Sequence, residues 1–226
     1  GDITAFLRGI AFYTSRWQHT QYVLGSFDIK IAFDAQQHDE LHKALENNGT
    51  PTETRMATAQ DYTNKTAKLH ITETVQTDEI PFTQGGWQGG TRTPGEFNAI
   101  LHNIYTGTIT KWRKEGIGYH IEGRECNHFI WADNIILIAN NIPEMQRMLD
   151  ELTTNTLDAK FMWKEGEIMA GGDLVDAKGN LKDNPDPDTQ TITTWIADKN
   201  DTTKCNYETL PIKTEITLLG TKLHYT

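Results

Sequence analysis

Two aspartates, Asp28 and Asp133, stand at the ends of strongly apolar stretches about a hundred residues apart. Residues 128–139 contain two apolar runs separated by a short polar step that includes Asp133, and residues 27–34 carry Asp28. Ile-rich runs bounded by turn residues are typical of buried strands, so a tight hairpin places Asp133 at its tip. Carboxylates on adjacent strands suit Mg²⁺, which prefers oxygen ligands.

An ordinary structural role explains each aspartate equally well when it is taken alone. Asp133 suits the turn of a plain hairpin, because Asp and Asn tolerate turn geometry. Asp28 suits a turn at the end of its strand. The choice between turn residues and a metal site therefore depends on the surrounding motifs.

Three motifs occur in order between Phe27 and Asn134. The sequence FDIKIAFD (27–34) has an aspartate followed five residues later by the aromatic Phe33. GGWQGGTRTP (85–94) precedes Phe97 and Asn98, and WADN (131–134) ends in Asn134. Together they resemble the palm of a reverse transcriptase, with its aromatic-Ala-Asp-Asp motif and its G-x-x-Q-G-x-x-x-(S/T)-P-x-x-F-N segment. The shared order and spacing make the resemblance specific, whereas each motif alone is weak.

The resemblance is closest to the non-LTR (LINE-type) branch of retroelements. The Trp-Ala-Asp motif is followed by Trp163-Lys164, a pattern that looks like the retroelements of dinoflagellates. The resemblance covers about residues 1 to 225, with its specific motifs between Asp28 and Lys164. It implies an α+β fold, a reverse-transcriptase-like palm with an antiparallel sheet and helices packed on one face.

The resemblance implies catalytic roles for Asp28, Asp133, Asn134 and Lys164. The two aspartates would hold Mg²⁺ or Mn²⁺ for two-metal nucleotidyl transfer, with the carbonyl of Ile29 as a further ligand. Lys164 would donate a proton to leaving pyrophosphate, although a lone strand lysine is more often simply solvated. Asn134 departs from the family, because a neutral amide replaces a charged carboxylate and lowers the expected affinity for metal.

Further residues are implied to bind nucleotide or primer. Phe33 would lie under the sugar of the incoming nucleotide and reject a 2′-hydroxyl, and core packing is the alternative. Gln88 and Gly89 would touch the templating base pair, and a flexible turn is the alternative. Arg92 would contact phosphate, with solvation as the alternative. The final implied role belongs to Leu219-Gly220, which look like the hairpin that grips the primer.

Hydrophobic periodicity predicts the secondary structure. Helices are predicted over residues 4–17, 38–48, 52–64 and 96–114, and from Pro143 onward. Strands are predicted over residues 22–29, 68–74, 79–82, within 118–139, 161–164, 191–197 and 210–219. Residues 171–190 are rich in Gly, Asp and Pro and are predicted to form a loop. The expected segments are a fingers-helix remnant (1–20), the palm (21–169), a loop insertion (170–190) and primer-grip-like strands after the palm (191–226).

Composition limits the function classes. The 226 residues carry a formal net charge of −10, from 21 basic and 31 acidic residues, which argues against a broad basic surface for nucleic acid. The two cysteines favour a reducing, intracellular compartment, with neither a disulfide framework nor a zinc site. No apolar run approaches the roughly 18 residues of a membrane span. We also expect no signal peptide, because no basic region precedes an apolar one at the start.

Two functions follow from these observations. The first is an RNA-directed DNA polymerase core that binds an RNA template and a DNA primer. The alternative is a domesticated, catalytically inactive palm that serves as a structural or RNA-contacting subunit and binds protein partners in a larger assembly. Asp28, Phe33, Gln88 and Gly89 favour the first; the acidity, Asn134 and the short stretch before Asp28 favour the second.

Overall fold

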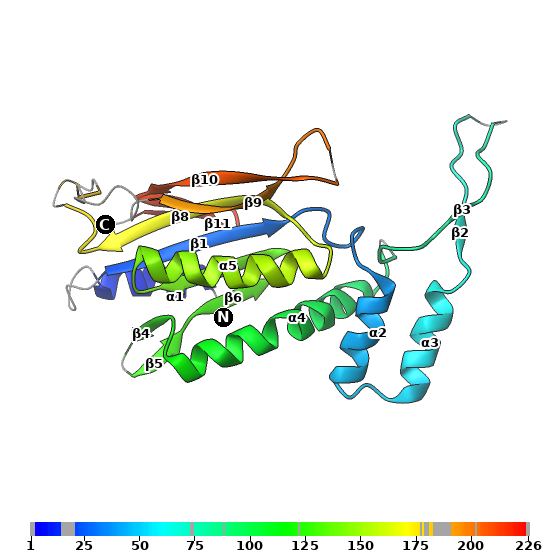
Figure 1. Cartoon of the computed structure of the whole chain (residues 1–226), viewed down its shortest axis with the longest axis horizontal. Coiled ribbons are helices and arrows are strands. Elements are labelled where there is room, and N and C mark those ends of the chain that lie inside the picture. Colours follow the sequence, from blue (N-terminus) through cyan, green and yellow to red (C-terminus); the bar gives the residue numbers. More distant parts are fainter. Residues whose placement is uncertain are drawn as a thin grey trace. The chain divides into compact units, whose positions relative to one another are not determined.

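The structure is a computed structural model that divides the chain into two compact units (Figure 1). It describes residues 3–14, 21–72, 75–87, 89–121, 123–176, 178, 181–182, 191–201 and 203–224. The first unit comprises residues 1–30, 108–157 and 162–226, and the second comprises residues 31–107 and 158–161. Among the described residues, no helix is both long and apolar enough to span a bilayer.

The first unit is built on a six-stranded sheet with the order β10-β9-β8-β1-β7-β6. Its strands are β1 (Gln21–Ile29), β6 (His128–Trp131), β7 (Asn134–Ala139), β8 (Trp163–Gly172), β9 (Thr191–Ala197) and β10 (Cys205–Lys213). The sheet is antiparallel apart from short parallel pairings of β8 with β9 and β10. Two small hairpins join the unit: β4 (Tyr119–Ile121) with β5 (Arg124–Cys126), and β11 (Glu215–Leu218) with β12 (Thr221–His224).

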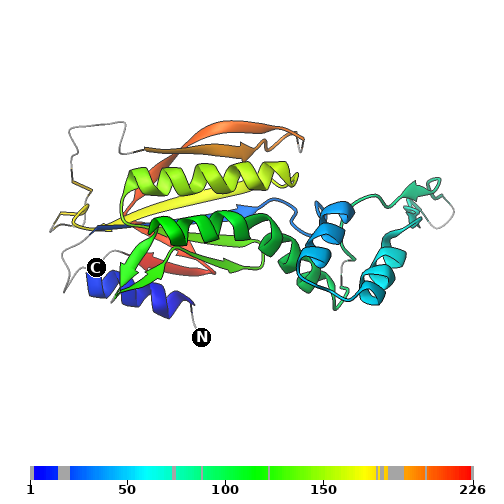
Figure 2. The ribbon, with the colours of Figure 1, turned by 60° about the horizontal axis from the view of Figure 1, so that its bottom comes forward.

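One face of this sheet is covered by helix α5 (Ile142–Asp158), which runs along the strands (Figures 1 and 2). Side chains alternate along a strand, so β1 directs Phe27 to this face, where its ring lies 5.6 Å from that of Trp163. The indole of Trp163 donates a 2.9 Å hydrogen bond to Thr153 of α5. Gly166 leaves room for Phe27, since a Cβ there would lie 2.8 Å from its ring.

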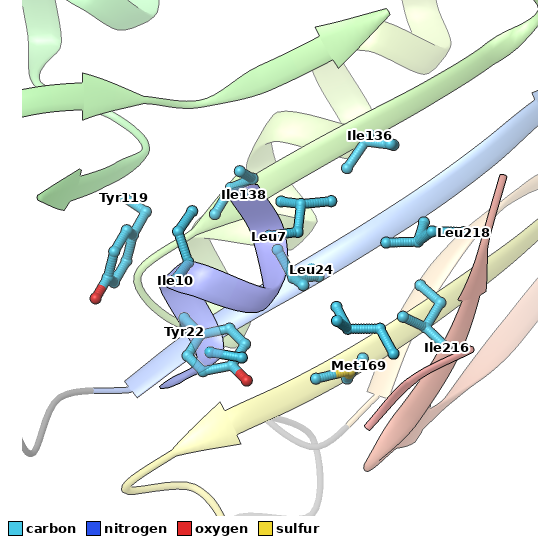
Figure 3. Close-up of a cluster of buried hydrophobic side chains, with 12 residues drawn as sticks. Leu7, Ile10, Tyr22, Leu24, Tyr119, Ile136, Ile138, Met169, Ile216 and Leu218 are labelled. Atoms are coloured by element: carbon cyan, nitrogen blue, oxygen red, sulfur yellow. The ribbon is translucent and has the colours of Figure 1, made fainter. Parts of the chain in front are cut away.

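The opposite face is covered by helix α1 (Ile3–Tyr13) and the β11–β12 hairpin. Figure 3 shows Leu7 and Ile10 of α1 against Leu24 and Ile138 of the sheet. The same cluster also contains Tyr22, Tyr119, Ile136, Met169, Ile216, Leu218 and Leu223. A fully buried side chain of this size contributes about 1.5–3 kcal/mol, so this cluster fixes both α1 and the hairpin to the sheet.

The second unit contains three helical segments and a short ribbon. Its elements are α2 (His38–Asn47), α3 (Thr52–Tyr62), β2 (Thr66–Ala67), β3 (Ile80–Pro81) and the start of α4 (Thr93–Glu115). The last turns of α4, from Thr108, belong to the first unit. There Trp112 donates a 2.9 Å hydrogen bond to Glu151 of α5.

Most predicted elements are confirmed, including β1, α2, α3, β9 and the hairpin around Asp133. The predicted strand over 68–74 is wrong where the structure describes it, because only Thr66–Ala67 pairs, with Ile80–Pro81. Leu69 and Ile71 alternate as in a strand but are 62% and 64% exposed, so no core holds them. The helix predicted from 96 begins at Thr93, because Pro94 fits the first turn of a helix.

Three further boundaries differ from the prediction. The strand predicted over 161–164 extends to Gly172, because pairing with β1 continues through the two glycines. The strand predicted over 210–219 is two strands divided at Thr214. The first helix ends at Tyr13, and residues 15–17 of its prediction lie outside the described residues. The predicted functional segments remain predictions.

The two hairpin turns provide a stability test. Ala132 has a φ of 52°, in the left-handed region that disfavours side chains, and Gly220 has a φ of 75°. We expect Ala132→Gly to raise the free energy of unfolding by about 0.5–1 kcal/mol, because glycine adopts this φ without steric cost. Urea denaturation measures the change.

The matched control is Gly220→Ala, where an added Cβ would meet nothing within 4 Å. Only backbone strain acts there, so we expect a loss of about 1 kcal/mol. A neutral or destabilising Ala132→Gly beside a destabilising Gly220→Ala would contradict the turn conformation around Asp133.

Candidate active site

The predicted aspartates Asp28 and Asp133 line one pocket of about 650 Å³ in the first unit. Asn134, Leu219 and Gly220 line the same pocket. The other lining residues are Ser26, Glu165, Gly166, Glu167, Lys213 and Thr217. The pocket therefore gathers five of the predicted site residues from three separate parts of the chain.

Strand pairing brings the two aspartates together. Asp28 of β1 lies opposite Asn134 of β7, and the amide of Ile29 donates a 2.9 Å hydrogen bond to the carbonyl of Asp133. Ala132 and Asp133 form the two-residue turn between Trp131 and Asn134. Because this turn is tied to the end of β1, the register that buries the Ile-rich strand also fixes Asp133 beside Asp28.

Asn134 is part of a neutral polar pair. The hydroxyl of Ser26 donates a 3.1 Å hydrogen bond to the amide oxygen of Asn134. That oxygen is the only acceptor of the side chain, because the amide nitrogen can only donate. The position therefore contributes no negative charge, and its oxygen is already engaged by Ser26.

Lys164 reaches Asp28 through an irregularity in the sheet. The register between β1 and β8 shifts after Asp28, which lies opposite Glu165, whereas Ile29 lies opposite Trp163. Lys164 is thus the extra residue of a β-bulge, a feature that re-aims side chains. Its ammonium lies 2.7 Å from the Asp28 carboxylate. This hydrogen bond and the negative charge of Asp28 raise the pKa of Lys164 above its ordinary value.

Glu167 attaches the second hairpin to the sheet next to the pocket. One of its oxygens lies 3.0 Å from the ammonium of Lys213, and the other accepts a 3.0 Å hydrogen bond from the amide of Thr217 in β11. Partial burial acts to raise the pKa of Glu167, but the bonds from Thr217 and Lys213 outweigh it and lower the pKa. The turn at Leu219-Gly220 is therefore held beside Asp28 by a charged contact as well as by apolar packing.

The other predicted residues belong to the second unit and are described within it. Phe33 is half-buried, with its ring 5.3 Å from that of Phe97, and Gly89 is exposed with a φ of 78°. Arg92 pairs with Asp61 and lies 3.8 Å from Glu96. The hydrogen bond to Asp61 raises the pKa of Arg92, and the guanidinium is already engaged by this carboxylate. Gln88 lies outside the described residues.

The donor set of the pocket fits a cation that also binds a substrate. Among the described residues, no cluster of three or more His, Cys, Asp or Glu side chains has metal-binding geometry. Mg²⁺ needs fewer protein ligands, because it is commonly held by one or two carboxylates together with substrate phosphates and water. The ammonium of Lys164 supplies the positive charge next to Asp28 in this structure. Asp28 and Asp133, which line one pocket, together are a carboxylate set of this size.

Sequence reasoning missed the polar neighbours of the aspartates. Ser26 and Glu167 stand two residues from Asp28 and from Glu165, so strand periodicity could have placed them on the same face as Asp28. Lys213 carried no such signal, because its contact depends on where β10 returns to β8. The bulge at Lys164 was also invisible, since the residues around it read as a regular strand.

Comparisons with known proteins agree with this geometry. The family model described as reverse transcriptase (RNA-dependent DNA polymerase) matches residues 5–165. A relative is the retrovirus-related Pol polyprotein from type-1 retrotransposable element R2 of Popillia japonica, 26% identical over 126 residues. That match covers 56% of this chain and 17% of the relative, so the chain matches a small part of it.

Two solved telomerase structures from Candida tropicalis have a similar fold. The apo enzyme truncated from its C-terminal domain gives a TM-score of 0.55 at 12% identity, covering 91% of this chain and 39% of that chain. The enzyme in complex with a TWJ fragment of telomeric RNA gives 0.54 at 12% identity, covering 74% and 29%. At this identity the likeness concerns the fold alone, and it identifies the α+β palm.

Glu167 gives a pH test of how the hairpin is held. Its pKa in the folded protein lies below the ordinary 4.5, so its bonds stabilise the fold above that value and are lost as the pH falls through the lower one. Glu167→Gln keeps an acceptor for Thr217 but carries no charge. We expect the wild type to lose stability more steeply than this variant between about pH 5 and 3.

The measurement is the urea midpoint at a series of pH values. Glu165→Gln is the matched control, because Glu165 is exposed and lies 3.8 Å from Lys164. Equal acid slopes for the wild type and Glu167→Gln would show that Glu167 does not hold the hairpin.

Proposed function

The chain belongs to the reverse transcriptase family, and from that premise we propose that it is the palm of an RNA-directed DNA polymerase of a non-LTR retroelement. The pocket that contains both Asp28 and Asp133 carries this proposal. Nucleotidyl transfer needs negative oxygens at one point on a rigid scaffold, and two paired strands supply them here. The closeness to dinoflagellate elements remains a prediction based on Trp163-Lys164.

The proposed substrates are an RNA template, a DNA primer and a deoxynucleoside triphosphate. When bound, Mg²⁺ or Mn²⁺ supplies the charge that activates the primer hydroxyl and steadies the triphosphate. Asp28 and Asp133 would hold these cations, with the carbonyl of Ile29 as a further ligand. The Leu219-Gly220 turn would hold the primer end, because Glu167 and the apolar cluster fix it beside the aspartates.

Lys164 has two proposed states. Without substrate, its ammonium neutralises Asp28 at 2.7 Å. Cations that bind to Asp28 would replace this charge and release the lysine toward the leaving pyrophosphate. The ammonium would then be placed to donate a proton to the pyrophosphate oxygen.

The proposed nucleotide contacts come from the second unit. Phe33 would face the sugar and exclude a 2′-hydroxyl, Gln88 and Gly89 would contact the templating pair, and Arg92 would contact phosphate. The Arg92 contact is the weakest of these, because Asp61 and Glu96 already neutralise its guanidinium.

A specific observation favours a second candidate function. Asn134 is neutral and its oxygen accepts a hydrogen bond from Ser26, so the pocket has one carboxylate fewer than the family motif. A palm weakened in this way could serve as a domesticated structural or RNA-contacting subunit that binds protein partners. The two candidates differ in whether Asp28 matters for a reaction or only for the fold.

Primer extension separates the two candidates. We expect the chain to extend a DNA primer on an RNA template with Mg²⁺ or Mn²⁺, and Asp28→Ala to reduce the rate at least about a hundredfold, because one of two metal ligands is lost. Glu208→Ala is the control, since it removes an exposed carboxylate of β10 that does not line the pocket. Unmeasurable extension by the wild type, or extension by Asp28→Ala at the wild-type rate, would reject the polymerase proposal.

Asn134→Asp tests the charge deficit of the pocket. An added carboxylate beside Asp28 and Asp133 should raise the affinity for divalent cations, because it restores one negative charge. A Mg²⁺ or Mn²⁺ titration of primer extension, or calorimetry of Mn²⁺ binding, should show half-saturation at a several-fold lower concentration. Asn64→Asp, at an exposed turn of the second unit, is the control, and an unchanged titration for Asn134→Asp would count against a metal site here.

A further inference from the structure

Trp87 is an exposed aromatic side chain in a cluster of nearly parallel rings in the second unit. Its ring stacks on Phe82 with centroids 4.9 Å apart and an interplanar angle of 26°. Tyr62 lies nearly parallel to both rings, at 6.3 Å from Phe82 and 6.5 Å from Trp87, and His38 packs on Tyr62 at 4.5 Å. Trp87 is 43% exposed, whereas Tyr62 is buried, so the cluster reaches the surface at the indole of Trp87.

The backbone around Trp87 is fixed as firmly as its ring. Its carbonyl accepts hydrogen bonds from the amide of Gly90 at 2.9 Å and from the hydroxyl of Thr93 at 2.7 Å. On the preceding side, the His38 ring donates to the carbonyl of Gly85 at 2.9 Å. Gly86 permits this packing, since a Cβ there would lie 2.4 Å from the methyl group of Thr93. An aromatic face held in place in advance loses little conformational freedom when a ligand stacks on it.

A buried amide below the same loop is left without partners. Gln36 is fully buried, and neither its amide nitrogen nor its oxygen has a hydrogen-bond partner in the described part of the chain. Its oxygen would lie 3.3 Å from a Cβ on Gly86, so it faces the loop that carries Trp87. Unsatisfied buried groups are rare and often mark a functional segment. The unpaired amide of Gln36 therefore lies against the loop that carries Trp87.

We propose that Trp87 is a stacking platform for one base of single-stranded nucleic acid. The inference deepens the proposed function, on which it rests for the class of ligand. The family segment G-x-x-Q-G leaves the position of Trp87 open, so the role comes from this chain's own residue. Among the described Phe, Tyr and Trp side chains of the second unit, Trp87 is the only exposed one.

The surroundings favour a nucleobase over a protein surface. Two glycines precede Trp87, and Gln88 and then two glycines follow it in the sequence. The exposed residues on either side of this segment are polar: Thr83, Gln84, Thr91 and Arg92. A protein interface centres on a larger apolar patch, whereas a base needs only one flat ring on which to stack. Arg92 is neutralised by Asp61 and Glu96, so binding here depends on stacking more than on charge.

The test measures binding of a labelled, mixed-sequence single-stranded RNA by fluorescence anisotropy over a range of salt concentrations. Trp87→Leu should weaken binding about tenfold, the loss of one stacked base, and leave the slope of log affinity against log salt unchanged, because no phosphate contact is removed. Trp87→Phe should stay within about threefold of the wild type, since it keeps a smaller aromatic face. This second variant also guards against a loss caused by misfolding.

Trp195→Leu is the matched control, because Trp195 is 45% exposed, packs on Tyr207 and lies in the first unit. Its RNA affinity should equal that of the wild type. Equal weakening by Trp195→Leu, a changed salt slope, or wild-type RNA affinity in Trp87→Leu would overturn the proposal; the last result would assign Trp87 to a protein contact or to packing.

The same variants separate this inference from the polymerase proposal. If the wild type extends no primer but Trp87→Leu weakens RNA binding as expected, the polymerase proposal fails and the platform stands. If Asp28→Ala abolishes extension while Trp87→Leu binds RNA normally, the platform fails and the polymerase proposal stands.

Discussion

The position of β1 between β7 and β8 is the constraint on which the site depends. Both neighbours pair with β1 along its length, so its residues are buried from both sides until Asp28. A slip of one residue would turn Asp28 toward the face covered by α5 and Phe27 toward the face covered by α1. The packing of Phe27 on Trp163 on one face, and of Leu24 in the α1 cluster on the other, therefore selects the register that exposes Asp28.

The residues that pack the core and the residues that form the pocket thus alternate along the same strands. On β1, Leu24, Ser26 and Asp28 share one face of the sheet. On β7, Asn134, Ile136 and Ile138 lie on that same face, opposite Asp28, Ser26 and Leu24. The β11–β12 hairpin packs Ile216 and Leu218 against the apolar residues of this face, and its turn lines the pocket with Asp28. Stability and the geometry of the site are therefore consequences of one pairing pattern, and they cannot change independently.

Much of this could be predicted from local patterns, because strands and turns are specified by neighbouring residues. The apolar stretch over residues 22–29 and the turn at Asp133 need no knowledge of the fold, and the order of the motifs predicts that Asp28 and Asp133 meet. The alternation at Leu69 and Ile71 misled, because periodicity does not reveal whether a core exists to bury the apolar side. The bulge at Lys164 and the contact of Lys213 with Glu167 depend on register between distant strands, which the sequence of either strand alone does not contain.

Charge at the pocket limits what can enter it. Four carboxylates, those of Asp28, Asp133, Glu165 and Glu167, are opposed by the ammonium groups of Lys164 and Lys213, so the pocket carries excess negative charge. A bare triphosphate is repelled by such a site, whereas one accompanied by divalent cations is attracted. The same deficit of positive charge extends to the whole chain, with its net charge of −10. Any strand of nucleic acid held by these residues must therefore be held largely by cations and by uncharged contacts such as stacking.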